Sequence, residues 1–120
     1  MAKQNGLLES EKTLHALREI ERDPQITQRA LARKLEISLG KINYLINELI
    51  KKGVIEIKNF KNSKNKLAYM YLLTPQGIKI KLELTQRFFV WKSQEYELLK
   101  KELERLQQEA AVDAGRGEIF

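Results

Sequence analysis

Residues 27–53, with the sequence TQRALARKLEISLGKINYLINELIKKG, constrain the fold more than any other segment. Apolar side chains recur at helical spacing in two short stretches, and Thr27 and Ser38 stand where helix N-caps are expected. The two residues before Ser38 predict a tight turn, and Gly53 is placed for a left-handed helix end. The segment therefore predicts two amphipathic helices joined by a turn, as in a helix-turn-helix.

The two predicted helices have distinct inner and outer faces. The apolar side chains expected to face inward are Leu31, Ala32, Leu35, Ile42, Leu45, Ile46 and Leu49. In a helix-turn-helix the second helix enters the DNA major groove, so its outer side chains are candidates for reading bases. These candidates are Ser38, Lys41, Asn43, Tyr44 and Asn47. Asparagine suits adenine and this face carries no arginine, which favours A·T-rich half-sites.

Further residues are expected to contact the DNA backbone. They are Thr27, Gln28, Arg29, Arg33, Gly40, Lys51, Lys58, Lys61, Asn62, Lys64 and Lys66. The glycine near the start of the second helix costs about 1 kcal/mol relative to alanine. Its presence predicts close approach by either the DNA backbone or a packed neighbouring helix.

The segment after the helix-turn-helix predicts a β-hairpin. Residues 54–58 and 67–73 are rich in β-branched and aromatic side chains and flank a polar loop, 59–66. The loop has Lys58 at its base, carries three further lysines and contains no acid. Placed directly after a helix-turn-helix, it is expected to be a wing that touches phosphates.

One predicted helix lies on each side of this central region. Residues 8–22 place Leu14, Leu17 and Ile20 on one side and end at Asp23-Pro24. The only histidine, His15, has no partners in the sequence that would make it a ligand or a catalyst.

A much longer helix is predicted over residues 75–110, with Thr74 as its cap and Pro75 in its first turn. Apolar residues along it alternate steps of four and three, a heptad seam interrupted by Thr85 and Lys92. The helix would be about 50 Å long, too long to bury its seam on so small a domain. The predicted dimer interface consists of Ile78, Leu82, Phe89, Tyr96, Leu99, Leu103 and Leu106. Alternatively, the helix bends near residues 92–94 and folds back on its own domain. Parallel and antiparallel pairings both remain open.

Composition bounds the class of protein. The net charge of +6 over 120 residues favours a polyanionic partner, and the absence of cysteine excludes disulfides and thiolate metal sites. No apolar run is long enough for a membrane span and no signal peptide is visible, so we expect a cytoplasmic protein. No catalytic cluster, phosphate loop or metal-ligand spacing is present, which argues against an enzyme and predicts no cofactor.

The expected fold class is mainly α with a small β-hairpin wing. Residues 8–74 would form the winged helix-turn-helix domain, 75–110 the dimerisation helix and 111–120 a disordered tail.

The order of these segments resembles the MarR family of bacterial transcriptional regulators, and within it the subgroup associated with exopolysaccharide genes. The residues that carry the resemblance are Gln28, Leu31, Ala32, Leu35, Ser38, Asn43, Leu45, Leu49, Gly53, Tyr69, Tyr71, Leu73, Thr74, Pro75 and Gly77. The family's wing usually carries Asp-x-Arg, where this chain has Asn65-Lys66-Leu67, so Lys64 or Lys66 is expected to replace the arginine. The resemblance implies a homodimer that binds double-stranded DNA at a pseudo-palindromic operator, usually as a repressor. Many members also respond to a small-molecule effector, which the sequence does not identify.

The sequence therefore favours a sequence-specific DNA-binding regulator. Two alternatives remain: a non-specific architectural DNA-binding protein, and a protein-interaction module that uses the long helix.

Overall fold

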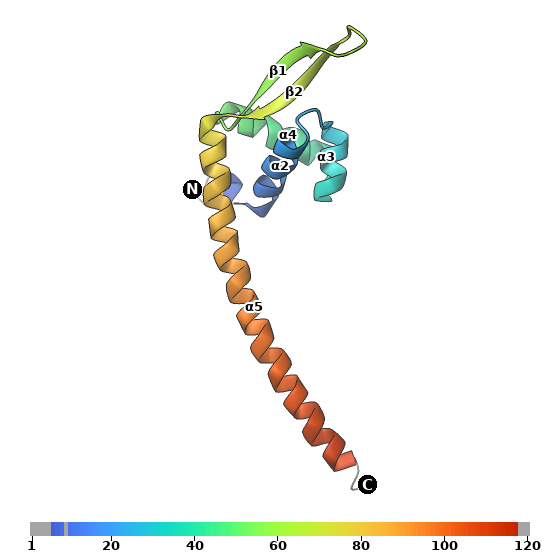
Figure 1. The fold of residues 1–120 in the computed structure, drawn as a ribbon, viewed down its shortest axis with the longest axis vertical. Coiled ribbons are helices and arrows are strands. Elements are labelled where there is room, and N and C mark those ends of the chain that lie inside the picture. Colours follow the sequence, from blue (N-terminus) through green and yellow to red (C-terminus); the bar gives the residue numbers. More distant parts are fainter. Residues whose placement is uncertain (1–5, 9, 118–120) are drawn as a thin grey trace. The chain divides into compact units, whose positions relative to one another are not determined.

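The computed structural model describes residues 6–8 and 10–117. Its elements are α2 (Glu11–Arg22), α3 (Gln28–Leu35), α4 (Leu39–Lys51), β1 (Ile55–Lys61), β2 (Leu67–Leu73) and α5 (Pro75–Gly117) (Figure 1). The chain divides into two compact units between Gln86 and Arg87, so the first turns of α5 belong to the same unit as the other elements. The predicted fold class, mainly α with a two-stranded hairpin, is confirmed.

Helix α2 is shorter than predicted at its N-terminal end. Ser10 caps it, because its Oγ accepts a hydrogen bond of 3.0 Å from the Thr13 N–H, and the helix begins at Glu11 rather than at residue 8. Residue 9 lies outside the described part of the chain. At the other end the helix stops before Asp23, as the following proline predicts.

The helix-turn-helix forms as predicted. Thr27 caps α3 by accepting from the Ala30 N–H at 3.0 Å, and Ser38 caps α4 in the same way. Glu36 adopts a left-handed φ of 58°, which reverses the chain between the helices. After α4, Gly53 has a φ of 72°, the left-handed conformation expected of it.

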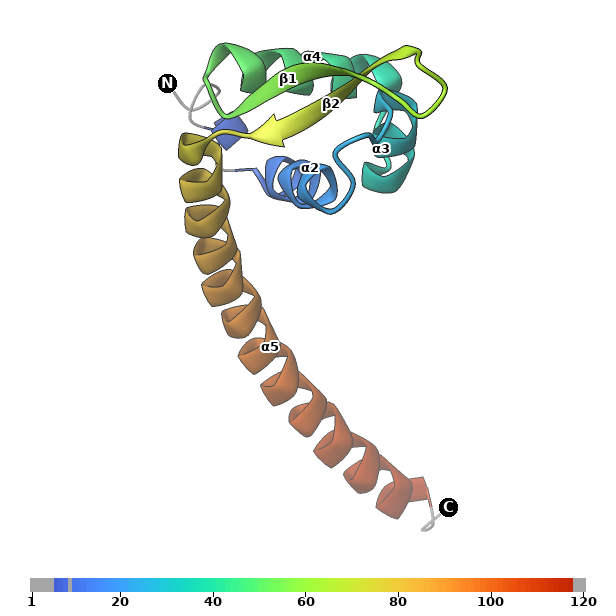
Figure 2. The same ribbon diagram turned by 45° about the horizontal axis from the view of Figure 1, so that its top comes forward.

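The core of this unit lies between the three short helices and the base of the hairpin. All seven residues predicted to face inward from α3 and α4 are buried. They are joined by Leu14, Leu17 and Ile20 of α2 and by Ile55 and Tyr71 of the hairpin. Figure 2 shows α2, α3 and α4 gathered beside the two strands. Burial of these apolar side chains is the main stabilising term for so small a fold.

The hairpin is longer than predicted. Strand β1 continues to Lys61, so Lys58 lies within the strand, and the connecting turn is reduced to residues 62–66. The strands pair from Ile55 with Leu73 to Lys61 with Leu67. Polar residues extend the strand because a two-stranded ribbon leaves most of its side chains in water, so the ladder does not require an apolar sequence. We call residues 55–73 the wing.

Two asparagines build the turn of the wing. The Asn62 side-chain carbonyl accepts from the N–H groups of Lys64 at 2.9 Å and Lys66 at 3.0 Å. Asn65 adopts a left-handed φ of 60°. The lysine side chains of the turn are not needed for its geometry.

Val54 and Thr74, the residues on either side of the wing, make close contacts with each other and with the first turn of α5. The Thr74 N–H donates to the Val54 carbonyl at 3.0 Å, and the Thr74 Oγ1 accepts from the Gly77 N–H at 3.0 Å. A Cβ on Gly77 would lie only 2.0 Å from the Val54 carbonyl oxygen. Only glycine fits this position. The predicted cap at Thr74 and the first helical position of Pro75 are both confirmed.

Helix α5 extends beyond its predicted end. It runs to Gly117 without a break near residues 92–94, so the expectation of a disordered segment over 111–117 is wrong. Residues 110–114 include three alanines and no proline, and alanine has the highest helix propensity, which accounts for the extension. Residues 118–120 lie outside the described part of the chain.

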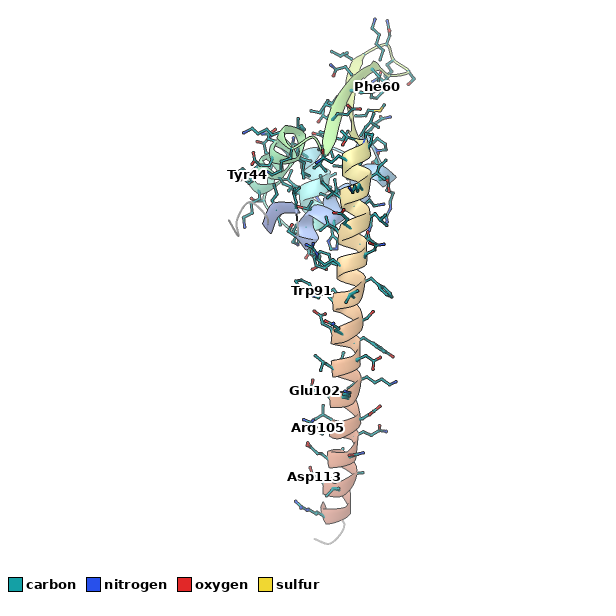
Figure 3. The ribbon with its side chains drawn as sticks, turned by 90° about the vertical axis from the view of Figure 1, so that its left-hand side faces the viewer. Tyr44, Phe60, Trp91, Glu102, Arg105 and Asp113 are labelled. Atoms are coloured by element: carbon teal, nitrogen blue, oxygen red, sulfur yellow. The ribbon has the colours of Figure 1, made fainter. Side chains whose placement is uncertain are left out.

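The apolar seam of α5 is exposed. The fractional exposure of the seven predicted interface side chains ranges from 52% for Leu106 to 71% for Phe89. Beside the seam, Phe88 and Trp91 form an edge-to-face ring contact with centroids 5.4 Å apart. Figure 3 labels Trp91 and, farther along α5, Glu102, Arg105 and Asp113. No helix in the described residues is long and apolar enough to span a membrane.

Candidate nucleic-acid interface

The outer side of α4 is a polar surface in water. The apolar residues on the inner side of α4 are buried in the core. Because side chains follow the helical period, the residues on the opposite side of the helix face the solvent. Lys41, Asn43, Tyr44 and Asn47 are all exposed, and with Ser38 they form what we call the reading face. Tyr44 is 63% exposed and extends away from the core (Figure 3). The structure therefore places all five residues predicted to read bases in exposed positions on α4 or at its N-cap, with Ser38 bonded to Lys41 and Asn43 bonded to Asn47.

The start of α4 is open to close approach. The Ser38 Oγ accepts from the Lys41 N–H at 3.1 Å, which occupies one lone pair in the helix cap. A Cβ added to Gly40 would meet only the Ser38 Oγ, at 4.0 Å. Among the described residues, no neighbouring helix packs against Gly40. Of the two causes predicted for this glycine, a packed helix is therefore not observed, and close approach by the DNA backbone stays a prediction.

Two asparagines of the reading face belong to a chain of hydrogen bonds that leads into the core. The Asn47 Nδ2 donates to the Asn43 Oδ1 at 3.2 Å, and the Asn43 Nδ2 donates to the Gln28 Oε1 at 3.1 Å. The Gln28 Nε2 then donates to the Tyr71 hydroxyl at 3.2 Å. We call these four residues the amide relay. It connects α4, α3 and β2.

Tyr71 is the buried end of the relay. Its side chain is 2% exposed, and its backbone N–H donates to the Pro24 carbonyl at 2.8 Å. Its ring meets Tyr69 edge to face at 5.5 Å. Burial raises the pKa of Tyr71 above its usual value, the bond from Gln28 opposes this rise, and the nearby Tyr69 adds to it. The phenol is therefore neutral at physiological pH.

Exposed basic side chains also lie on two other elements, α3 and the wing. Arg29 and Arg33 lie exposed on α3, and the wing presents four exposed lysines. The wing lysines are Lys58, Lys61, Lys64 and Lys66. Within residues 6–8 and 10–117, none of these six cations pairs with a carboxylate. They remain available for phosphates.

The other predicted backbone contacts have structural partners. Lys51 pairs with Glu48 at 3.4 Å, an exposed ion pair worth little in water. Thr27 caps α3, and Asn62 holds the turn of the wing. Gln28 is half-buried within the relay.

Sequence reasoning missed the relay. Gln28 and Tyr71 are 43 residues apart, and neither spacing nor composition indicates that their side chains meet. Gln28 is predicted as a backbone contact and Tyr71 as part of a strand, and both also carry the family resemblance together with Asn43. That shared membership, and the polar character of Gln28 next to the N-cap of a bracing helix, were the available signals.

Among the described residues, no three His, Cys, Asp or Glu side chains gather into a possible metal site. The arrangement offers amides, a phenol and cations around an exposed helix. These groups are suited to base edges and phosphates rather than to bond-breaking chemistry.

This combination of a three-helix core, an exposed second helix and a basic wing defines a winged helix-turn-helix domain. Residues 9–56 match the family model described as winged helix-turn-helix DNA-binding. A comparison with curated protein sequences gives no match.

Solved structures with the same fold are transcriptional regulators of the MarR and PadR type. A PadR-like regulator from Bacillus cereus is 22% identical, covers 72% of this chain and 89% of its own, and has a TM-score of 0.63. The adhesin competence repressor AdcR from Streptococcus pyogenes is 24% identical with a TM-score of 0.61, covering 94% of this chain and 84% of its own. ZitR from Lactococcus lactis, a zinc-responsive MarR family member, is 19% identical with a TM-score of 0.58, covering 74% and 60%. At these identities the likeness establishes the fold that this chain shares with such regulators.

Proposed function

We propose that the chain is a homodimeric, sequence-specific DNA-binding transcriptional regulator that acts as a repressor in the cytoplasm. The observation that carries this proposal is the reading face: an exposed, amide-rich helix surface held outward by a buried apolar side. The match of residues 9–56 to a winged helix-turn-helix DNA-binding family supports it. Asn43 and Asn47 would read adenine edges in the major groove, and the wing lysines would contact flanking phosphates.

The dimer is proposed from the exposed seam of α5. Seven large apolar side chains along one line of a helix form a patch that monomeric proteins rarely leave in water. A second copy supplies an identical seam, and heptad spacing allows the two to interlock. Two reading faces would then enter successive major grooves about 34–36 Å apart, which implies a pseudo-palindromic operator.

The target genes are proposed from sequence resemblance alone. The chain resembles MarR-type proteins associated with exopolysaccharide gene clusters, so we propose that its operators control exopolysaccharide synthesis. Transcript levels of such genes in a strain lacking the protein would test this; unchanged transcripts would contradict it.

The central test is selection of binding sites from a random DNA library, followed by titration of the selected site and a scrambled site at two salt concentrations. A pseudo-palindromic consensus bound far more tightly than scrambled DNA supports an operator-reading dimer. Equal binding to both, with steep salt dependence, would indicate an architectural protein instead. No binding to any DNA would redirect the search to protein partners of α5.

Role assignment is tested with alanine at the reading face. Asn43→Ala or Asn47→Ala should cost about 1–3 kcal/mol on the selected site and relax its sequence preference. Binding to scrambled DNA should be nearly unchanged. Equal weakening on both DNAs would contradict base reading by these residues.

A further inference from the structure

The amide relay contains a buried residue, Tyr71, and a half-buried one, Gln28, behind the two asparagines proposed to read bases. Tyr71 is buried, and Gln28 lies between it and Asn43. Resting on the function proposed above, we propose that Tyr71 and Gln28 are positioning residues that set the sequence preference by orienting the amides of Asn43 and Asn47.

The direction of the bonds supports this role. Each of the three amides donates through its nitrogen toward the core, and the oxygens of Gln28 and Asn43 each accept from the residue farther out. An amide nitrogen carries two protons and its oxygen two lone pairs. Asn47, at the outer end, therefore keeps a free carbonyl and one free N–H, the pair that binds adenine in a bidentate way.

The anchoring of the relay in the core also supports the positioning role of Tyr71 and Gln28. The position of the Tyr71 hydroxyl is set by the buried ring and by the backbone bond to Pro24. A neutral phenol oxygen accepts from Gln28, which leaves the Gln28 carbonyl facing Asn43. Without the hydroxyl, the Gln28 amide loses its fixed orientation, and so do the two asparagines beyond it.

Preorganisation gives an expected size for the effect. An unconstrained side chain must be immobilised when it binds, and this lowers affinity by about 2- to 12-fold for each side chain. Removing the Tyr71 hydroxyl should therefore weaken binding to the selected site by about 2- to 12-fold for each asparagine that loses its fixed orientation. Scrambled DNA, held through phosphates, should be bound as before.

The test compares Tyr71→Phe with the wild type in the full-length protein. The change keeps the buried ring and removes the hydroxyl that accepts from Gln28. We expect Tyr71→Phe to lower the ratio of selected-site to scrambled-site affinity, with loss of preference confined to the A·T positions. A wild-type ratio and consensus in Tyr71→Phe would overturn the inference.

Two further measurements separate a relay from general loss of structure. In a double-mutant cycle, Gln28→Ala combined with Tyr71→Phe should lower the ratio no more than the larger single change, because both cut the same chain. Additive losses would contradict the relay. In DNA-free protein, the side-chain NH2 resonances of Gln28 and Asn43 should shift in Tyr71→Phe relative to the wild type.

The outcomes distinguish this inference from the function beneath it. If the wild type itself does not discriminate between the two DNAs, the proposed function and the positioning role both fail. If it discriminates and Tyr71→Phe does so equally well, only the positioning role fails.

Discussion

The substitution Gly77→Ala should destabilise the winged unit, whereas the same change at Gly40 should stabilise it. Both glycines lie in the first turn of a helix, so alanine offers each position up to about 1 kcal/mol in helix propensity. Their surroundings differ. At Gly40 the new methyl group meets nothing nearer than 4.0 Å, but at Gly77 it lies 2.0 Å from the Val54 carbonyl oxygen.

The size of the destabilisation by Gly77→Ala depends on how far the new methyl group and the Val54 carbonyl must move apart. Ordinary van der Waals contact begins at 3.4 Å, so the methyl group and the carbonyl must separate by about 1.4 Å. The Val54 carbonyl accepts from the N–H of Thr74, a bond that contributes about 1 kcal/mol, while the single Thr74 hydroxyl proton is shared with the nearer Gly53 carbonyl. Overpacking costs about 1–3 kcal/mol in addition. After the propensity gain is subtracted, we expect Gly77→Ala to lower the free energy of unfolding by about 1–3 kcal/mol.

The assay is urea denaturation followed by circular dichroism, with all variants at one protein concentration because an associating protein's stability depends on it. Gly40→Ala should raise the free energy of unfolding by up to about 1 kcal/mol. It should also weaken DNA binding if this bare backbone is where DNA approaches. A Gly77→Ala protein as stable as the wild type would refute the steric argument, since no flexible side chain is available there to move aside.

The remaining predictions concern charge, association and pH. Lys61→Ala or Lys64→Ala should weaken selected and scrambled DNA alike and reduce the salt slope by about one unit, measured by titration at several salt concentrations; a loss limited to the selected site would contradict a phosphate role. Leu99→Glu, in the exposed seam, should shift the protein toward monomer in sedimentation velocity, while Leu98→Glu, equally apolar and 68% exposed but outside the seam, should not; equal effects would argue against the seam. The raised pKa of Tyr71 means that the unfolded chain ionises first, so stability should fall as the pH rises above about 10. Denaturation at pH 9 and pH 11 should show a smaller fall in Tyr71→Phe, and an identical fall would exclude Tyr71 as its source.

Local signals were sufficient to predict the helix-turn-helix. Thr27 and Ser38 cap their helices through bonds to residues three positions later, and the inner apolar residues follow one helical period. The residues that specify each helix are therefore close together in the sequence. Gly53 was predictable for the same reason, because a left-handed helix end is a local requirement.

The errors arose where a boundary depends on pairing or on the absence of a stop signal. Lys61 lies in a strand because it pairs with Leu67, which a residue-by-residue reading of polarity could not detect. Residues 111–117 lack heptad spacing and include Gly115 and Gly117, which usually favour a helix end, but they contain no proline and α5 continues to Gly117. Gly77 was recognised from resemblance alone, and its packing against Val54 needed three-dimensional coordinates. The relay required two side chains 43 residues apart to meet, which no local pattern encodes.

The turn of the wing has a consequence for how the protein could search a chromosome. Because asparagine side chains and backbone groups hold this turn, Lys64 and Lys66 can change without altering its shape. If these lysines contact phosphates as proposed, each adds sequence-independent attraction, and such attraction governs how long a protein slides on DNA before it dissociates. Mutation at these positions would then adjust the time spent on non-target DNA while the reading face stays as it is. Search speed and target choice would then be separately adjustable properties of one small domain.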